Sequence, residues 1–134
     1  MVGQHGLVVG QARERVGNGR AVVELESHDG RDDEALHLVV VDEGEVVGTC
    51  RLLAEGSEVK LGRMAVASSH RGRRLAAALL VLADARAREL GARRIVLAAQ
   101  LSAQAVYERA GYAPYGDVFL DAGIEHVMMG KALE

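Results

Sequence analysis

A basic turn at residues 70–74 is the part of this sequence whose residue types most plainly suit binding chemistry. The segment HRGRR separates a short apolar run, Leu61–Val66, from an Ala- and Leu-rich run that begins at Leu75. The first run favours a buried strand, and the second favours a helix beginning near Arg73. A helix N-terminus presents unpaired N–H groups and the positive end of its dipole, so the turn suits an anion such as a phosphate.

Three arginines in the turn strengthen this interpretation. The guanidinium groups of Arg71, Arg73 and Arg74 can pair with phosphate oxygens. The two common nucleotide-binding patterns, GxxxxGK[ST] and GxGxxG, are absent here. If the turn is considered alone, the alternative is a solvated basic loop ahead of an ordinary amphipathic helix.

The elements that position the turn are predicted from periodicity and turn residues. We expect a hairpin of strands 36–41 and 46–53 with a turn at 42–45, then a third strand at 58–66. The helix then runs to Leu90 and ends at Gly91. A strand at 94–98 follows the helix and should lie parallel to the strand before it. Where two such strands diverge, a cleft opens beside the helix N-terminus.

The two ends of the chain differ in how clearly they can be interpreted. Residues 102–109 predict a short helix that stops at Gly111, followed by strands 112–116 and 127–133 joined through 117–125. In the first 35 residues, 6–12 predicts a strand, Asn18-Gly19 a turn, and 20–26 a strand or a helix end.

Length and composition restrict the class of protein. With 134 residues the chain is expected to be one domain with a sizeable core, and 49% hydrophobic residues fit a packed protein. No apolar run approaches the roughly 18 residues of a membrane span, and the start lacks the layout of a signal peptide, so the cytoplasm is expected. One cysteine, Cys50, excludes an internal disulfide, and no histidine pair has metal-ligand spacing, so no metal is expected. A net charge of -3 argues against general nucleic-acid binding.

At the basic turn the chain resembles a known family. The segment RMAVASSHRGRRLAAALL, residues 63–80, is similar to the acetyl-CoA-binding motif of the GCN5-related N-acetyltransferase (GNAT) family, which reads Gln or Arg, two residues, Gly, one residue, Gly or Ala. Arg71 and Ala76 match its first and last positions, and Arg74 takes the place of the middle Gly. Two later segments, 99–112 and 119–133, also match in order and spacing. The resemblance covers about residues 29–133.

The resemblance implies an α/β (α+β) fold with a mixed, mostly antiparallel sheet, flanking helices and a splayed parallel strand pair. It implies a single N-acetyltransferase domain over 1–134, with a divergent part at 1–35, a cofactor-binding core at 36–98 and a C-terminal helix and strands at 99–134. Members usually carry one or two helices after the first strand, and this chain has little room for them. The residues implied to bind acetyl-CoA are Met64, Ala65 and Val66 through main chain, and Arg71, Gly72, Arg73, Arg74, Leu75, Ala76 and Ala77 in the turn and helix start.

The reaction implied by the resemblance is direct attack of an amine on the acetyl thioester. Such attack needs a base for the amine, a donor for the oxyanion and an acid for the leaving thiolate. Tyr107 matches the tyrosine that protonates the sulfur in many members, and a phenol holds its proton at neutral pH. Periodicity alone makes Tyr107 a core residue of an amphipathic helix.

Two residues are candidates for the base. The end of the chain, GIEHVMMGKAL, is similar to the glyphosate N-acetyltransferase type, which implies that His126 acts as base, and imidazole suits that role. The alternative is a histidine that only pairs at a strand end. Glu58, near the start of the central strand, is the second candidate, acting through water.

The function we predict is transfer of an acetyl group from acetyl-CoA to a primary amine of a small molecule. We expect a cytoplasmic enzyme, and the resemblance suggests a homodimer. Two alternatives belong to other classes. One is a non-catalytic acyl-CoA-binding module, suggested by Arg74 in the Gly position. The other is an interaction or nucleic-acid module built on the basic turn.

Overall fold

The structure is a computed structural model that describes residues 7–15, 21–28, 34–71 and 74–133. Its strands form one sheet of eight in the order β1-β2-β3-β4-β5-β6-β8-β7. The first five are consecutive antiparallel neighbours, as expected for strands that follow one another closely along the chain. They are β1 (Leu7–Arg15), β2 (Ala21–His28), β3 (Glu34–Asp42), β4 (Glu45–Glu55) and β5 (Glu58–Val66).

The first 35 residues contribute two strands to the edge of this sheet. The strand expected at 6–12 corresponds to β1 from residue 7 on. The segment 20–26, for which strand and helix end were both open, belongs to strand β2 from residue 21 on. The expected turn at Asn18-Gly19 lies outside the described residues. Within 7–15 and 21–28 the structure contains strand only, so the described part of the N-terminus adds no helix to the sheet.

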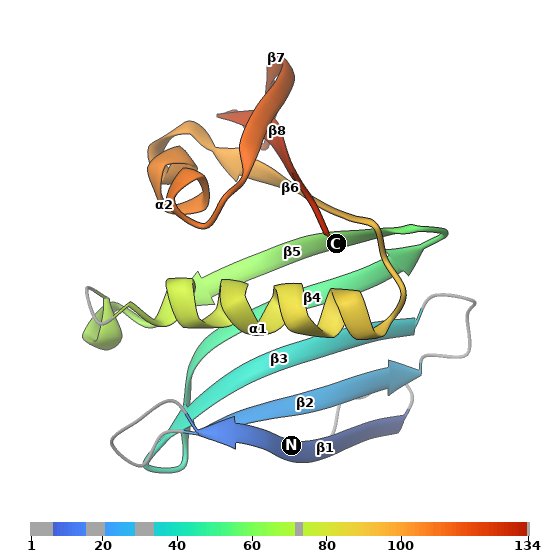
Figure 1. The fold of residues 1–134 in the computed structure, drawn as a ribbon. Coiled ribbons are helices and arrows are strands. Elements are labelled where there is room, and N and C mark those ends of the chain that lie inside the picture. Colours follow the sequence, from blue (N-terminus) through green and yellow to red (C-terminus); the bar gives the residue numbers. More distant parts are fainter. Residues whose placement is uncertain (1–6, 16–20, 29–33, 72–73, 134) are drawn as a thin grey trace.

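The helix α1 (Leu75–Glu89) packs across one face of the sheet, over β3, β4 and β5 (Figure 1). It begins two residues later than the sequence predicts, because Arg74 has left-handed backbone angles and acts as its N-cap. At the other end, Gly91 has a φ of 83°, and the amides of Gly91 and Ala92 bond the carbonyls of Arg88 and Ala87. This pattern is a Schellman motif, which confirms the predicted stop.

The chain after α1 forms the second part of the sheet. Strand β6 (Arg94–Gln100) is parallel to β5, as expected for a strand that follows a crossover helix. A short 3-10 turn (Leu101–Ala103) leads into α2 (Gln104–Arg109), which Gly111 ends at a φ of 98°. The last two strands, β7 (Ala113–Asp121) and β8 (Ile124–Ala132), form a hairpin in which β8 also pairs with β6.

The prediction for this hairpin was wrong in one respect. Residues 117–125 were expected to be a connection, yet 117–121 continue β7 and the turn is only Ala122-Gly123. Both turn residues have positive φ, 53° and 77°, which defines a tight type I′ turn. Alanine rarely adopts such angles, so the sequence contains no ordinary turn signal at this point.

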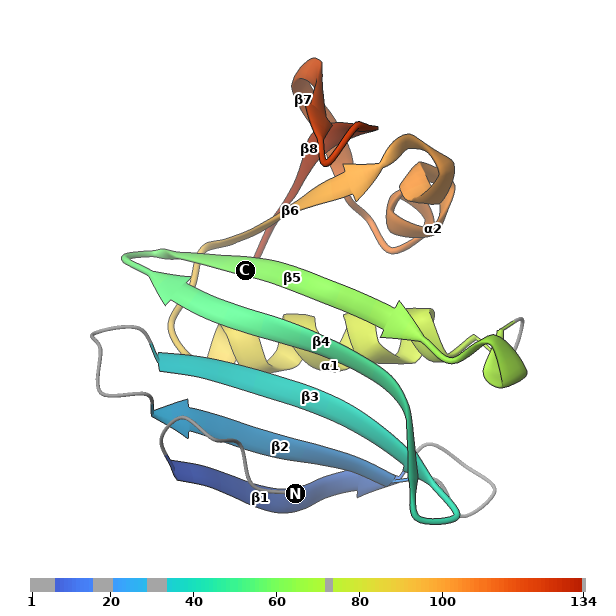
Figure 2. The ribbon, with the colours of Figure 1, turned by 180° about the vertical axis from the view of Figure 1, so that it is seen from behind.

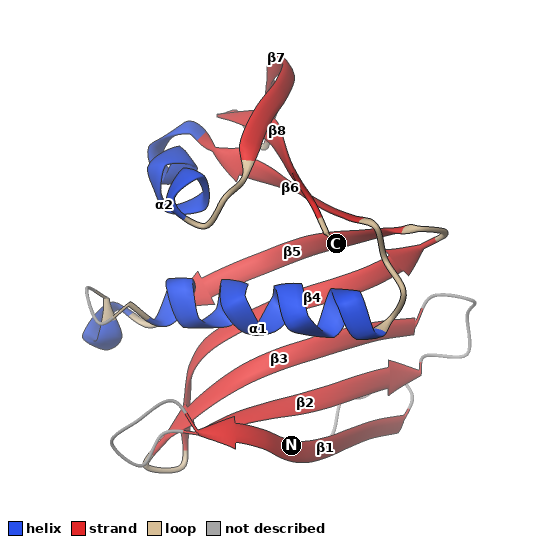
Figure 3. Ribbon diagram, viewed as in Figure 1, coloured by secondary structure: helices blue, strands red, loops and turns tan. Residues whose placement is uncertain are grey.

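The core lies between α1 and the sheet and continues under α2. Its members are apolar side chains from β3 to β6, from one face of α1, and from β8. Figure 3 shows the two helices on the same side of the sheet, with no described helix over the opposite face. Among the described residues, no helix is long and apolar enough to cross a membrane. The largest fully buried side chains are Leu38, Leu52, Leu61, Leu75, Leu79, Leu80, Ile95, Leu97 and Met129.

Candidate active site

The parallel strands β5 and β6 remain neighbours over only a short distance. They pair at three positions, from Glu58 opposite Arg94 to Lys60 opposite Val96. Beyond Lys60 the strands separate, as the view from behind shows (Figure 2). The edge of β5 that faces β6 therefore has no strand partner from Leu61 onwards, and its backbone groups are open to another hydrogen-bonding chain or ligand.

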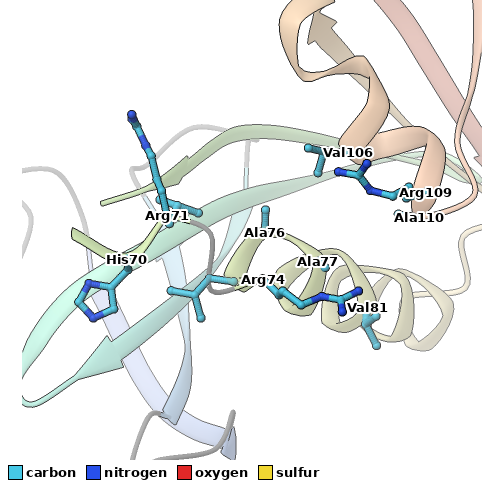
Figure 4. A pocket seen from close by; sticks show the side chains of 11 residues that line it. His70, Arg71, Arg74, Ala76, Ala77, Val81, Val106, Arg109 and Ala110 are labelled. Carbon is cyan, nitrogen blue, oxygen red and sulfur yellow. The ribbon is translucent and has the colours of Figure 1, made fainter. Parts of the chain in front are cut away.

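A cavity of about 410 Å³ lies where α1 and α2 face each other beside this divergence. Figure 4 shows side chains from the start of α1 on one side and from α2 on the other. Six residues that the sequence assigned to the cofactor site line the cavity, and five other residues complete it. The six are Val66, Arg71, Arg74, Leu75, Ala76 and Ala77, and the five are His70, Val81, Val106, Arg109 and Ala110.

The start of α1 is arranged as an anion site. Arg74 has φ 61° and ψ 26°, and no side chain caps the first turn of the helix. The amide groups of that turn therefore remain available beside Ala76 and Ala77, which line the cavity. The left-handed angles at Arg74 also explain why a glycine fits this position of the motif, since a residue with a Cβ is strained there.

The side chains around this helix start are basic. Arg71, Arg74 and Arg109 line the cavity together with His70. The charge of α1's dipole adds to theirs, so the site favours a ligand with several negative charges. Arg109 comes from α2, so basic groups reach the cavity from both of its walls (Figure 4).

His70 is held in place by two hydrogen bonds. Its Nε2 lies 2.8 Å from Oδ2 of Asp42 at the end of β3, and its Nδ1 lies 2.8 Å from Oγ of Ser69. Because a carboxylate only accepts, Nε2 carries the proton donated to Asp42. The pair connects the basic turn to the central sheet and fixes the position of the chain just before the cofactor motif.

Tyr107 lies in the core beneath the cavity and is not one of its lining residues. Its side chain is 8% exposed, and its ring packs edge-on against Tyr112 with centroids 6.1 Å apart. Burial, followed by the nearby Cys50, raises the pKa of the Tyr107 phenol, so it remains protonated at neutral pH. No residue of the described chain forms a hydrogen bond with its hydroxyl group.

Cys50 marks the point at which β5 is irregular. The pairing of β4 with β5 shifts between Thr49, opposite Ala65, and Arg51, opposite Gly62. Two residues of β5, Arg63 and Met64, therefore oppose Cys50 in a β-bulge, and Arg63 has a φ of 54°. The bulge bends β5 in the region where β5 no longer pairs with β6. Of the three main-chain candidates on β5, Val66 lines the cavity, whereas Met64 and Ala65 lie next to it along the unpaired edge.

His126 lies on β8, away from the cavity. Its ring stacks on Phe119, with centroids 5.8 Å apart, and its Nδ1 donates to the carbonyl of Ile124 at 2.8 Å. A carbonyl only accepts, so a neutral His126 carries its proton on Nδ1 and has a free lone pair on Nε2. Its neighbour Val127 belongs to the core under the helices, and side chains alternate along a strand. His126 therefore belongs to the opposite face of the sheet.

Glu58 lies at the end of β5 that is still paired with β6. Its carboxylate is 3.7 Å from the guanidinium of Arg94, its partner across the sheet. Five residues of extended strand separate it from the bulge at Arg63, which corresponds to about 16 Å. Gly72 and Arg73, the remaining predicted site residues, lie outside the described residues.

The residues missed by sequence reasoning come mainly from α2. Val106, Arg109 and Ala110 have the spacing i, i+3, i+4 of a single helix face, and that signal was available in the sequence. What the sequence does not contain is the direction in which that face points, because the direction depends on how α2 packs beside β6. Val81 is missed for a related reason, since it lies on α1 beyond the motif. His70 was assigned no definite function.

Comparison with known proteins agrees with this geometry. Residues 11–133 match the acetyltransferase (GNAT) domain family. The uncharacterized N-acetyltransferase YjcF of Bacillus subtilis is 34% identical over 107 residues, which cover 79% of this chain and 76% of YjcF. Among solved structures, an acyl-CoA N-acyltransferase from Pseudomonas aeruginosa has a TM-score of 0.68 and 30% identity, covering 74% of this chain and 69% of that one. An aminoglycoside 6'-N-acetyltransferase complexed with coenzyme A has a TM-score of 0.66 and 18% identity, covering 73% of this chain and 72% of that one.

The chain belongs to the GNAT acetyltransferase family. It is an acetyl-CoA-dependent N-acetyltransferase, and the predicted fold with its splayed parallel pair is confirmed. Membership of this enzyme family favours the predicted enzyme over the two non-enzymatic alternatives. The open amides of α1 and the three arginines of the cavity fit the phosphate groups of an acyl-CoA.

Proposed function

We propose that this enzyme transfers the acetyl group of acetyl-CoA directly to a primary amine of a small molecule. The observation that carries the proposal is the basic cavity between the two helices, which opens beside the unpaired edge of β5. The phosphates bind at the start of α1, with Arg71, Arg74 and Arg109 as their partners. Main-chain groups of Met64, Ala65 and Val66 pair with the rest of the cofactor and supply the donor for the oxyanion.

Tyr107 acts as the general acid in this proposal. Its raised pKa keeps the phenol protonated until a thiolate leaves, and its hydroxyl is not engaged by any described residue. The position near Cys50 supports this function, because Cys50 faces the bulge at which β5 has left β6. Proton transfer from Tyr107 to the departing sulfur completes the exchange of the C–S bond for a C–N bond.

His126 acts as the base that receives the amine proton. The helices and the cofactor cavity occupy one face of the sheet, so an acceptor amine has to approach the thioester from the other face. His126 belongs to that face, and its Nδ1–H bond to Ile124 leaves Nε2 able to accept a proton. The similarity of its segment to the glyphosate N-acetyltransferase type remains a prediction. Glu58 has no part in the proposal. It pairs with Arg94 where β5 and β6 are still neighbours, and the cavity lies where the two strands have separated.

The remaining assignments are also proposals. A small-molecule acceptor is supported by the similarity to the aminoglycoside acetyltransferase, whose name states transfer to such a compound.

A homodimer is supported by β7, an edge strand along which every side chain is exposed, including Val118, Phe119 and Leu120. Sedimentation equilibrium tests it, since a dimer has twice the mass of the 14.3 kDa chain. A cytoplasmic location and the division at residues 35 and 98 stay predictions.

The chemistry is tested by thiol release from acetyl-CoA in the presence of a panel of small primary amines. We expect Tyr107→Phe to lower kcat by about 100-fold, the lower range for general acid catalysis, with little change in the Kd of acetyl-CoA. Tyr115→Phe, which alters an exposed tyrosine of β7, is the matched control and should keep full activity. An unchanged kcat in Tyr107→Phe would return this residue to a purely structural function.

The base is tested separately by the pH dependence of the same reaction. We expect His126→Ala to remove or shift the acidic limb of the kcat/KM profile, because that limb reports protonation of the free base. A profile identical to that of the parent enzyme would exclude His126 as the base.

A further inference from the structure

An ion pair between a buried carboxylate and a partly buried lysine joins α1 to the C-terminal hairpin. Asp84 of α1 is 6% exposed, and Nζ of Lys131 on β8 donates a hydrogen bond to its Oδ2. The hydroxyl of Tyr112, just after α2, donates to Oδ1 of Asp84 at 3.3 Å. Burial, followed by the negative charge of Asp84, raises the pKa of the Tyr112 phenol, so it remains a donor. Both oxygens of the carboxylate are therefore engaged from outside α1.

Lys131 also holds the end of α2. Its Nζ donates to the carbonyl of Ala110 at 2.8 Å and lies 5.8 Å from the centroid of the Tyr112 ring. The side chain of Lys131 passes close to Gly111. A Cβ built at Gly111 would lie 3.2 Å from Cε of Lys131, so a side chain there would crowd the lysine. Gly111 also has a φ of 98°, so two separate constraints disfavour a side chain at this position.

The elements joined by this cluster are the two walls of the cofactor cavity. Ala76, Ala77 and Val81 line it from α1, and Val106 and Arg109 line it from α2 together with the C-cap residue Ala110 (Figure 4). Ala110 both lines the cavity and accepts the bond from Lys131. Asp84 lies about one helical turn beyond Val81 on the same helix. A shift of Lys131 or Asp84 therefore changes the position of one cavity wall relative to the other.

We propose that Asp84 and Lys131, with the Tyr112 hydroxyl and the Ala110 carbonyl, form a positioning latch that sets the separation of α1 and α2 and thereby the affinity for acetyl-CoA. The inference rests on the proposed binding of the cofactor between these helices. Hydrogen bonds suit this function because they are directional. The bonds made by the Asp84 carboxylate and the Lys131 ammonium group therefore fix one geometry of the two helices, which apolar contacts would not do. The latch residues do not touch the reacting atoms.

The decisive variant is the double substitution Asp84→Leu/Lys131→Met, because it removes both charges together and leaves neither of them without its partner. We expect this protein to fold and to bind acetyl-CoA roughly tenfold more weakly or worse in calorimetry, since small misplacements in a site have effects of up to about 100-fold. The single substitution Lys131→Arg keeps the positive charge. Its affinity for acetyl-CoA should therefore lie between that of the parent and that of the double variant. Glu89→Gln, which removes an ion pair with the neighbouring Arg86 on α1, is the control and should bind normally. Normal binding by the double variant would overturn the latch.

A distance measurement tests the latch without the cofactor. Cys50 is fully buried, so spin labels attach selectively to cysteines placed at the exposed positions Ala85 on α1 and Glu108 on α2. We expect a narrow distance distribution in the parent protein and a broader or longer one in the double variant and in Asp84→Asn. Identical distributions would refute the latch. Failure of the parent protein to bind acetyl-CoA would instead refute the proposed cofactor site, and the distances would still decide whether the latch exists.

Discussion

Arg74 combines a backbone constraint and a charge at one position of the cofactor motif. Its φ of 61° is a conformation that costs a residue with a Cβ about 1–2 kcal/mol, and glycine avoids this cost. The side chain nevertheless lines the cavity and supplies a positive charge to it. Arg74 in place of the motif's glycine therefore adds a positive charge to the cavity at some cost in backbone strain.

This explanation predicts the behaviour of Arg74→Gly. The released strain and the greater freedom of glycine in the unfolded chain nearly cancel, so the free energy of unfolding should change by less than about 1 kcal/mol. Ala85→Gly, at an exposed position inside α1, should lower it by about 1 kcal/mol, because glycine is a much poorer helix former than alanine. Urea unfolding measures both. Acetyl-CoA binding should weaken only in Arg74→Gly, and equal destabilisation of the two variants would contradict the account.

His37 gives the fold a predictable response to acid. Burial, followed by the charges of Arg51 and Arg63, lowers the pKa of its imidazole below the ordinary value of 6.5. The unfolded chain therefore binds a proton more readily than the folded one as the pH falls below about 6.5, and stability is lost in that range. Between pH 7.5 and 5.5, the free energy of unfolding should fall further in the parent than in His37→Gln. An equal fall in both proteins would show that His37 does not contribute.

Individual residues of the cavity could be predicted from the sequence where they lie within one local motif. Arg71, Arg74 and Ala76 follow one another in a strand–turn–helix segment, so their common location was predictable. Arg109 is a single arginine on a short helix, and only the packing of α2 against the rest of the molecule brings it to the cavity. No local pattern distinguishes such a residue from an ordinary exposed arginine.

At the scale of elements, the strands and helices were largely predictable because each is bounded by a turn residue with a clear physical function. Gly44, Gly91 and Gly111 all have positive φ and end or connect elements at the expected places. The hairpin of β7 and β8 is the exception, since Ala122 occupies a turn position that favours Asn or Gly. The bulge at Arg63 was also missed, because a register shift depends on the partner strand.

The turn at Ala122 predicts a stabilising substitution. Asparagine tolerates positive φ better than alanine, and Asn-Gly is a preferred type I′ pair. We expect Ala122→Asn to raise the free energy of unfolding by about 0.5–1 kcal/mol in urea titrations. Ala98→Asn, at an exposed position of β6 where asparagine is disfavoured, should not raise it. A loss of stability in Ala122→Asn would mean that the turn is not of this type.

At the scale of the whole molecule, the site exists because one sheet is divided between two groups of elements. α1 covers β3, β4 and β5, whereas α2, β7 and β8 accompany β6, and only three residue pairs join β5 to β6. The parallel relation of β5 and β6 followed from the helix between them. The length over which they pair, three positions, depends on long-range packing that no local pattern in the sequence shows.

Binding of the cofactor between α1 and α2 is tested by calorimetric titration of acetyl-CoA into the parent protein and into Arg109→Met. We expect micromolar binding by the parent, about -8 kcal/mol, and a Kd at least roughly tenfold higher in the variant, because a guanidinium bonded to phosphate contributes about 1.5–3 kcal/mol. Glu108→Gln, the neighbouring exposed residue on α2, is the control and should bind as the parent does. Equal affinity of the parent and Arg109→Met would contradict a cofactor held between the two helices.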